Sequence, residues 1–414
     1  MGVRAYSDSK NGVDAGALIG VEPLGVTVST DVASLLMIDC DCIVFCSRDD
    51  GTYPHDDEIL MLLAAGKSVV TPLPYQEARL CRDADFVARL DEACRTGRSV
   101  FHAGGIDPDL MSDRILLGLT GACADVKSVR LQECWDCSFA EEVPLPHAGF
   151  GMSPADAAKI EVTKTIANNF NTAIVRTAER VLGVKYDRVA DGHDYVPTPV
   201  DIEAPFLIPA GTVGRITHRM QGWVDAIGPD PFFTIEVNWL IGNGMLPEGV
   251  APGQYYVGTI EGRPSIRMAL DLKVSHKSND RVFKLGNMAV EPSYVATLVP
   301  CLQAIPHVCA AQPGVLPSFG PSLHWMADLR DSVAAEQSSK VAPGSTDDRT
   351  VSAGSTVRSR RRRTADDSKP VLCARGRPAT WRGTGSPCGL GAGFISLPIQ
   401  RAIEVFARLL YPSP

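Results

Sequence analysis

The chain has 414 residues, a formal net charge of −8 and a hydrophobic content of 45%. This balance is typical of a soluble globular protein with two or three domains, and the negative charge argues against nucleic-acid binding by the whole chain. No apolar run approaches the ~20 residues that span a bilayer, and no signal peptide opens the chain. Cysteines are scattered within apolar segments, which favours a reducing compartment, so we expect a cytoplasmic protein without a membrane partner.

Residues 1–124 alternate short apolar runs with helical patterns. We expect strands at 1–7, 25–29, 41–47, 67–72 and 99–103, and helices at 31–37, 56–65, 76–96 and 109–120. Asp31 is a predicted helix cap, and Gly66 is the predicted end of a helix. Strand–helix alternation at this spacing predicts βαβ units, and hence a Rossmann-type parallel sheet with helices on both faces.

The first expected strand resembles the second strand of such a domain. The polar turn Ser7-Asp8-Ser9-Lys10 follows it, and in dinucleotide-binding units this turn holds the adenosine ribose, about 20 residues after the phosphate loop. No G-x-G-x-x-G precedes the turn. We therefore expect 1–124 to be an N-terminally truncated Rossmann domain that lacks its first strand and its pyrophosphate cradle.

The same turn bears on the choice of cofactor. Asp8 suits the free 2′-OH of NAD, whereas Ser7, Ser9 and Lys10 supply donors for the 2′-phosphate of NADP. We expect NADP or NAD, with a slight preference for NADP. An ordinary polar turn is the alternative interpretation.

Residues 125–331 have a different pattern. A long helix at 163–182 precedes alternating stretches at 213–224, 231–240, 254–261 and 265–275, which predict an α+β domain with a mostly antiparallel sheet. The segment 332–414 is rich in Ser, Gly, Pro and Arg and is expected to be a disordered tail. Its basic run, Arg358–Arg363, is interpreted as solvated, with a nucleic-acid or nuclear-type patch as the alternative.

Three loops follow predicted parallel strands and are expected to line one crevice, because ligands bind outside the carboxyl ends of such strands. They contain Ser47 and Arg48, the segment 72–77, and Gly104 and Gly105. The two glycines permit close approach of a ligand. Asp107 is a predicted helix N-cap with Pro108 at the first helical position.

Glu77 is the candidate catalytic residue. A carboxylate after the strand 67–72 is placed to bind a substrate ammonium and to take or give a proton during hydride transfer. The alternative is that Glu77 is simply an acid in the first turn of a helix, where the helix dipole stabilises it.

No metal site is expected. Cys134-Trp-Asp-Cys137 is a single C-x-x-C, and a zinc site needs a second pair or histidines at ligand spacing. His147, His193 and His218 stand isolated in the sequence, so core or surface roles are expected for them.

Several segments together resemble a known family. They are GVRAYSDSKNGVDAG at 2–16, DCIVFCS at 41–47, GKSVVTPLP at 66–74 and GGIDPDLMSDR at 104–114. They resemble actinobacterial proteins with a dihydrodipicolinate reductase N-terminal domain, similar to 2,4-diaminopentanoate dehydrogenase and the native amine dehydrogenases. The resemblance covers roughly residues 1–330. The His-His pair and the K-x-D-A-P-S-G-T segment of true dihydrodipicolinate reductases are missing.

The resemblance implies an NAD(P)H-dependent oxidoreductase that interconverts a small amine and a carbonyl compound plus ammonia. By position, Glu77 corresponds to the family's pocket glutamate, and the α+β domain is expected to shape the substrate pocket and a homodimer. Trp135 and Phe150 are candidate pocket residues. The alternative is a truncated, non-catalytic paralogue that keeps only the dimerisation fold.

Overall fold

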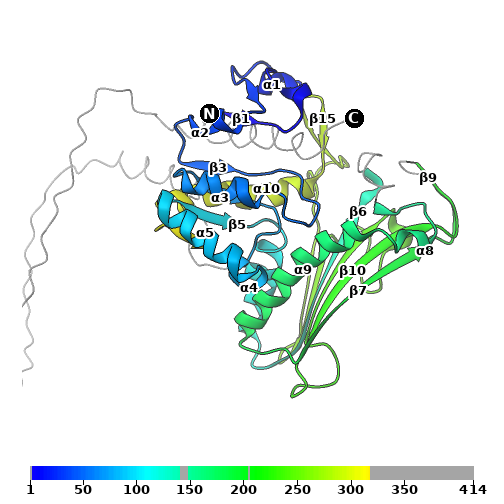
Figure 1. The fold of residues 1–414 in the computed structure, drawn as a ribbon. Helices are drawn as coiled ribbons and strands as arrows, with labels where there is room; N and C mark the ends of the chain where they lie inside the picture. The colour runs from blue at the N-terminus through cyan, green and yellow to red at the C-terminus, as the bar shows by residue number, and fades with distance from the viewer. Residues whose placement is uncertain (1, 140–147, 204–205, 318–414) are drawn as a thin grey trace, which may run out of the picture. The chain divides into compact units, whose positions relative to one another are not determined.

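A computed structural model describes residues 2–139, 148–203 and 206–317 (Figure 1). These residues belong to one compact unit, and a second unit, 327–396, lies outside the described range. The predicted tail at 332–414, with Arg358–Arg363, also lies outside it, as does His147.

Four strands form a parallel sheet in the order β16-β5-β4-β3. Their bounds are Cys42–Val44 for β3, Ser68–Thr71 for β4, Val100–Ala103 for β5 and Gly314–Leu316 for β16. Helices α3 (Asp56–Ala64) and α5 (Ala84–Gly97) pack on the face that carries Val69 and Phe101. Helix α10 (Pro292–Ala310) packs on the opposite face against Val70 and Val100. This confirms the predicted parallel α/β arrangement.

The first two strands form a sheet of their own. β1 (Val3–Arg4) pairs in parallel with β2 (Val28–Ser29), and neither pairs with β3. In a Rossmann sheet the first strand lies between the strands that correspond to β1 and β3. No strand among the described residues occupies that position.

Side chains at the end of β1 contact helix α3. Arg4 forms an ion pair with Glu58, with Nη1 and Oε1 2.5 Å apart, and the Tyr6 hydroxyl donates to the other Glu58 oxygen at 3.0 Å. The rings of Tyr6 and His55 lie with centroids 5.4 Å apart. These contacts place the carboxyl end of β1 near the start of α3.

Local capping follows the sequence in two predicted places. Asp31 accepts hydrogen bonds from the amides of Ala33 and Ser34 at the start of α2 (Val32–Leu36). Gly66 follows α3 with a φ of 85°, a left-handed conformation that glycine adopts without strain. Asp14 similarly caps the short helix α1 (Ala15–Leu18).

The prediction of a single helix at 76–96 is wrong. The segment forms α4 (Ala78–Cys81) and then α5, with a break at Arg82 and Asp83. The Asp83 carboxylate caps α5 by accepting from the Phe86 amide at 2.8 Å. The Arg82 guanidinium lies over the rings of Tyr53 and Phe86, and these contacts outweigh the helical periodicity.

The helix expected at 109–120 is also irregular. It comprises a π-helical segment, η2 (Leu110–Leu116), followed by α6 (Leu117–Leu119) and the 3-10 turn η3 (Thr120–Ala122). Asp109, not Asp107, precedes the first turn, so the predicted cap at Asp107 is wrong. Asp109 is fully buried and forms an ion pair with Arg114, which fixes this turn.

The second sheet has six strands in the order β13-β12-β6-β11-β10-β7. Their bounds are Val126–Asp136 for β6, Arg188–Pro197 for β7, Val213–Trp223 for β10, Phe233–Leu240 for β11, Tyr256–Gly262 for β12 and Ile266–Leu270 for β13. Every pairing is antiparallel except that of β6 with β11, which confirms the predicted mostly antiparallel sheet. β7 was not expected, because its sequence mixes polar and apolar residues.

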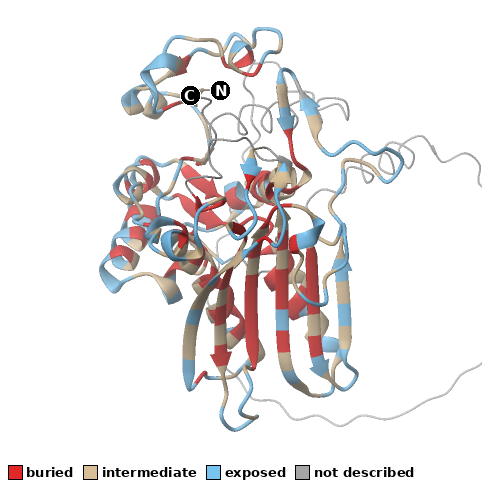
Figure 2. Ribbon diagram, turned by 90° about the vertical axis from the view of Figure 1, so that its right-hand side faces the viewer, coloured by how far each residue is buried: buried red, intermediate tan, exposed pale blue. Residues whose placement is uncertain are grey.

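Helix α9 (Glu161–Leu182) lies across one face of this sheet (Figure 1). Ile174, Val175 and Ala178 pack there against Leu131 and Phe233. We call this the helix-facing side of the sheet. Figure 2 shows the buried residues concentrated on its central strands.

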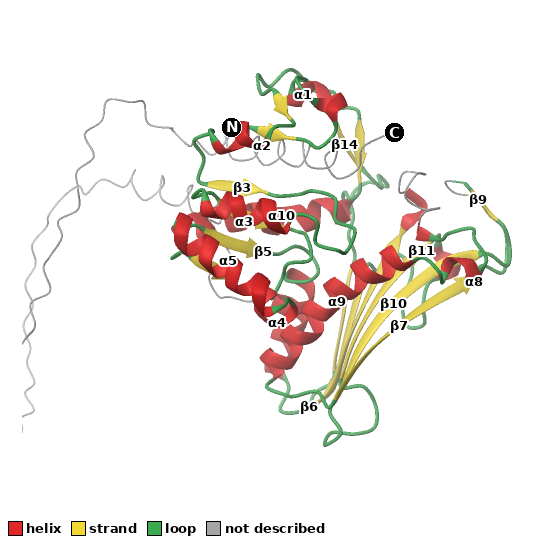
Figure 3. Cartoon of the chain, viewed as in Figure 1, coloured by secondary structure: helices red, strands yellow, loops and turns green. Residues whose placement is uncertain are grey.

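The chain then returns to the parallel sheet. α10 packs on it, and β16, which the sequence did not reveal, pairs with β5 (Figure 3). α10 is the one described helix long and apolar enough to cross a membrane, but it packs as a core helix does. Short elements complete the described chain: η1 (Asp8–Lys10), η4 (Cys137–Phe139), α8 (Pro154–Ala157), β8 (Ile202–Glu203), β9 (Leu207–Ile208), η5 (Asn243–Met245), β14 (Phe283–Leu285) and β15 (Met288–Val290).

Candidate active site

The carboxyl ends of the four parallel strands meet at one edge of their sheet. Ser47 and Arg48 follow β3, Glu77 follows β4, and Gly104 and Gly105 follow β5. The fold therefore brings these five predicted residues to the same edge. Ser47 is buried and Arg48 is exposed, and the Arg48 carbonyl accepts a hydrogen bond from His55 Nε2 at 2.6 Å.

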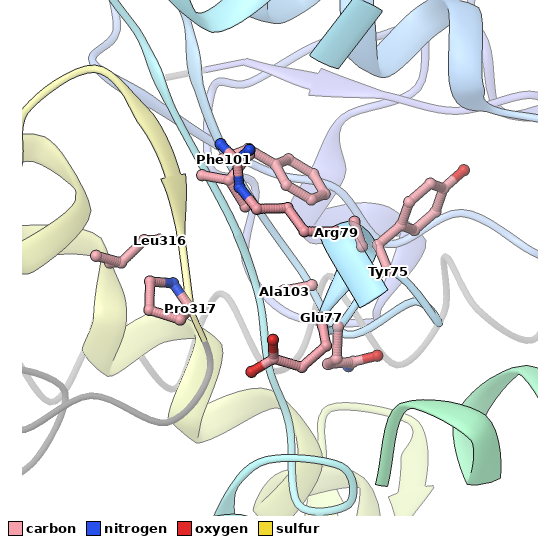
Figure 4. A pocket seen from close by; sticks show the side chains of 10 residues that line it. Tyr75, Glu77, Arg79, Phe101, Ala103, Leu316 and Pro317 are labelled. Carbon is pink, nitrogen blue, oxygen red and sulfur yellow. The ribbon is translucent and has the colours of Figure 1, made fainter. Parts of the chain in front are cut away.

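Glu77 lines a cavity of about 180 Å³ at this edge (Figure 4). The cavity lies between the segment after β4 and the ends of β5 and β16, and its walls include Tyr75, Phe101, Ala103 and Leu316. Its polar members are Gln76, Glu77 and Arg79, and an apolar wall with a few polar groups is the composition of a small-molecule site.

The backbone and side chain of Glu77 are both constrained. Its φ of 49° and ψ of 40° are left-handed, which is uncommon for a residue with a Cβ and is found disproportionately at functional sites. Its carboxylate Oε1 accepts from Arg180 Nη2 at 2.6 Å, and the Glu77 side chain is 9% exposed. The Arg180 guanidinium, from α9, therefore holds the Glu77 side chain in place at the cavity wall.

Gly104 is required by packing. A Cβ at this position would lie 2.7 Å from Asp109 Oδ2 and 2.9 Å from His102 Nε2, and its carbonyl accepts from the Cys301 thiol at 2.7 Å. A Cβ on Gly105 would lie no closer than 3.5 Å to Thr297, which is ordinary contact. The need for glycine at 104 thus comes from neighbouring side chains, and the predicted cofactor contacts of both glycines stay predictions.

A second carboxylate cluster, which the sequence did not reveal, lies beyond β5. Glu133 on β6 is the direct neighbour of Tyr256 on β12, so both side chains project from the same face. The Tyr255 hydroxyl donates to Glu133 Oε1 at 3.3 Å. Burial raises the pKa of Glu133 to about 7, and the hydrogen bond from Tyr255 counteracts part of that rise.

Asp107 belongs to the same cluster. Its pKa is well above the ordinary range, first because it is buried and second because Glu133 is nearby. The Tyr256 phenol is fully buried and lies within hydrogen-bonding reach of Glu133. Charge on Glu133 and Asp107 helps to raise the pKa of Tyr256, which places that phenol close to both acids. Alternating strand positions do not predict such a cluster, because its members are far apart in sequence.

Aromatic rings continue this face beyond Glu133. Trp135 and Trp239 pack edge to face with centroids 6.0 Å apart, and Trp135 and Tyr294 lie 6.2 Å apart. Trp135 Nε1 donates to Glu291 Oε2 at 2.7 Å, and burial raises the pKa of Glu291. Among the described residues, Glu133 and these three aromatic side chains are all partly exposed. We call this partly exposed cluster, in the described part of the chain, the open face.

The two predicted pocket aromatics differ in environment. Trp135 takes part in the open face, whereas Phe150 is 2% exposed and packs in an apolar cluster with Ala157, Val213 and Ile216. Their predicted contact with a substrate stays a prediction.

Two histidines that are isolated in the sequence meet in the structure. His193 on β7 is the direct neighbour of His218 on β10, and their Nδ1 atoms lie 2.8 Å apart. His193 Nε2 lies 3.2 Å from Asp191 Oδ2. Burial, and secondarily His193, lowers the pKa of His218 to about 3. The register of two strands, one of them unexpected, creates this pair, so spacing in the sequence could not reveal it.

The predicted adenosine-binding turn is exposed. Ser7, Ser9 and Asp8 are exposed, Lys10 is half-buried, and the hydroxyls of Ser7 and Ser9 are 2.7 Å apart. Such groups fit a ribose or its phosphate.

A pyrophosphate site is not present in the described part of the chain. No glycine-rich loop there leads from a strand into a helix, and α3, which follows β3, begins with Asp56, Asp57 and Glu58. An acidic first turn repels the phosphates that helix N-termini otherwise attract. The predicted contacts of Ser7, Asp8, Ser9 and Lys10 with a cofactor stay predictions.

The cysteines of the C-x-x-C segment are separated by packing. Cys134 packs with Leu240 and Met245, whereas Cys137 packs in the cluster that holds Phe150, and both are free thiols. In the described ranges no group of three His, Cys, Asp or Glu residues is arranged to hold a metal ion.

A Rossmann-like parallel sheet joined to a mostly antiparallel sheet is a layout that oxidoreductases use. No family model matches the chain. The chain is 26% identical to an amine dehydrogenase of Streptomyces virginiae over 282 residues, 65% of this chain and 77% of that protein. It is 21% identical to 2,4-diaminopentanoate dehydrogenase of Acetoanaerobium sticklandii over 294 residues, 70% of this chain and 73% of that protein.

Among solved structures, the amine dehydrogenase of Mycobacterium smegmatis matches with a TM-score of 0.58 at 18% identity, covering 77% of this chain and 87% of that one. This likeness confirms the fold. The sequence relatives, both dehydrogenases, support an oxidoreductase. Membership of the dihydrodipicolinate reductase N-terminal-domain family is not confirmed by these comparisons.

Proposed function

We propose that the chain is an NAD(P)-dependent oxidoreductase acting on a small amine, amino acid or carbonyl compound. The observation that carries this proposal is Glu77, which is ion-paired with Arg180 in a left-handed turn and lines a cavity at the carboxyl ends of parallel strands. Similarity to an amine dehydrogenase and to 2,4-diaminopentanoate dehydrogenase supports the class of substrate.

In this proposal Glu77 binds the ammonium or iminium group of the substrate. Arg180 holds the Glu77 side chain along the cavity wall, while the apolar walls exclude water. Ser7, Asp8, Ser9 and Lys10 would face the adenosine end of the cofactor. The pyrophosphate has no support in the described residues, so we assign no residue to it.

The lack of a pyrophosphate site among the described residues supports a second candidate function. A chain that keeps the α+β sheet but binds the dinucleotide poorly would be a non-catalytic paralogue. The separation of β1 and β2 from the four-stranded sheet favours this reading.

Titration of the purified chain with NADPH and NADH, followed by nicotinamide fluorescence, separates the two candidates. Binding followed by oxidation or reduction in a screen of amines and ketones supports the enzyme. A folded chain that binds neither nucleotide supports the paralogue.

The role of Glu77 predicts a loss of activity on substitution. Glu77→Gln keeps the shape but removes the charge that holds the amine, so kcat/KM should fall by about 100-fold or more, the range of a positioned charged group. Glu92→Gln, on the exposed side of α5, is the matched control and should change little. Undiminished hydride exchange in Glu77→Gln and Glu77→Ala would show that the assignment is wrong.

We also propose a homodimer and a cytoplasmic location. The resemblance to amine dehydrogenases supports the former, and light scattering of the purified chain tests it. A molecular mass of one chain across the working concentration range would exclude the dimer.

A further inference from the structure

The open face around Glu133 differs from the Glu77 cavity in the side chains that surround its carboxyl group. It is built on β6 and β12 of the six-stranded sheet and on the start of α10, whereas Glu77 follows β4 of the parallel sheet. Two carboxylates at such different places in the fold call for two different roles.

The two glutamates differ first in their partners. Glu77 is neutralised by Arg180, and Glu236, on the other side of the six-stranded sheet, is neutralised by Arg130 and Arg219. Glu133 has no salt-bridge partner among the described residues. The groups that face it are the phenols of Tyr255 and Tyr256 and the acid Asp107.

Acids and aromatic rings together select a cation. A partly buried carboxylate without a cationic side chain beside it attracts a positive ligand, because the ligand supplies the missing positive charge. Trp135, Trp239 and Tyr294 add ring faces and edges beside it, and indole and phenol rings stabilise ammonium groups. The buried Tyr256 phenol lies beside Glu133 and adds a second hydroxyl group to the Glu133 carboxyl.

A hydrogen-bond chain connects Glu133 to the far side of this face. Tyr255 donates to Glu133 and also contacts Ser293, and Ser293 Oγ donates to Glu291 Oε2 at 3.3 Å. Glu291 in turn accepts from Trp135. The phenol of Tyr255 is thus held from two sides, which fixes the position of the Glu133 carboxyl.

We propose that Glu133, positioned by Tyr255, is the group that exchanges a proton with the nitrogen of an amine bound at this face. This inference rests on the proposed amine or carbonyl substrate. When Glu133 is protonated, its O–H bond breaks as an N–H bond forms on the substrate nitrogen, which leaves a carboxylate beside an ammonium ion. The reverse transfer releases the neutral amine. Glu77, ion-paired with Arg180, takes no part in this transfer.

The first test reads the protonation of Glu133 directly. Difference infrared spectra of the full chain between pH 5 and pH 9 should show a protonated carboxyl band that disappears with a midpoint near pH 7 and is missing in Glu133→Gln. Glu261→Gln, on the exposed part of β12, is the control and should retain the band. Tyr255→Phe should raise the midpoint, because the phenol stabilises the carboxylate.

The second test uses n-butylamine as the probe and tryptophan fluorescence as the readout, with Trp135→Phe identifying the reporter. The butylammonium ion should bind the wild type more tightly as the pH rises through 7, by up to tenfold per unit below the midpoint. Glu133→Gln should lose at least tenfold in affinity, and Glu133→Asp should recover part of it.

Neither readout needs a nucleotide or turnover, so the result stands apart from the proposed oxidoreductase activity. The proposal is overturned if no carboxyl of a wild-type chain titrates near neutral pH, if Glu133→Gln binds butylammonium as the wild type does, or if the wild type does not bind it at all. Circular dichroism checks that each variant is folded.

Discussion

At the scale of single residues, the histidine pair shows how pairing between strands creates electrostatics. His218 is fully buried against His193, and Lys164 adds a further positive charge nearby. A proton on His218 would therefore meet both a low dielectric and neighbouring positive charge. The side chain stays neutral in the folded protein until the pH is far below its ordinary pKa.

This pair predicts a loss of stability in acid. The unfolded chain protonates this histidine near pH 6.5, whereas the folded pKa is about 3, so stability falls as the pH drops through 6.5. Between pH 7 and pH 5 the site should cost about 2 kcal/mol. Urea denaturation at both pH values should show a smaller acid loss for His218→Gln than for the wild type. Equal losses would show that His218 is not the group responsible.

The candidate site could be predicted only in part at this scale. The sequence predicts Glu77 as a site residue because the acid closely follows the end of a predicted strand. The sequence does not predict Glu133 as a site residue. Its partner Tyr255 comes from a distant part of the chain, and Asp107 comes from a different loop. What makes Glu133 unusual is its surroundings, and these arise only when the sheet forms.

At the scale of elements, predictions that rest on strong local sequence patterns agree with the structure. The caps at Asp31 and Gly66 and the alternating strands of the second sheet agree with the sequence, because local hydrogen bonds and period-two burial decide them. Elements whose form depends on tertiary contacts were not predicted. The break between α4 and α5 depends on Arg82 between two rings, and the three-residue strand β16 depends on the edge of β5.

The break between α4 and α5 gives a prediction of its own. Asp83→Ala removes the side-chain cap of α5, so the free energy of unfolding should fall by about 1 kcal/mol. Thermal or urea denaturation measures this change. Asp85→Ala is the control, because Asp85 lies two residues further along in the first turn and makes no capping hydrogen bond with its side chain. A loss that is the same for both variants would argue against the capping role.

At the scale of the whole molecule, the small N-terminal sheet should be the least protected part of the described chain. β1 and β2 have two residues each, and their buried cluster comprises only Ala5, Ala15 and Val28. Isolated two-stranded pairs are marginally stable. Hydrogen exchange followed by mass spectrometry should show residues 2–30 exchanging well before β4 and β5. Comparable protection of both regions would mean that further contacts hold the small sheet in place.

The return of the chain through α10 and β16 has a consequence for how this protein can be divided. Although the sheet that precedes Glu77 begins with β3 at Cys42, its last strand and one of its covering helices come from residues 292–316. A contiguous fragment that ends near residue 124 would leave β5 with a bare edge and Val70 without its cover. The two halves are therefore not interchangeable cassettes, and recombination between relatives would preserve the sheet only if both of its separate pieces came from the same parent.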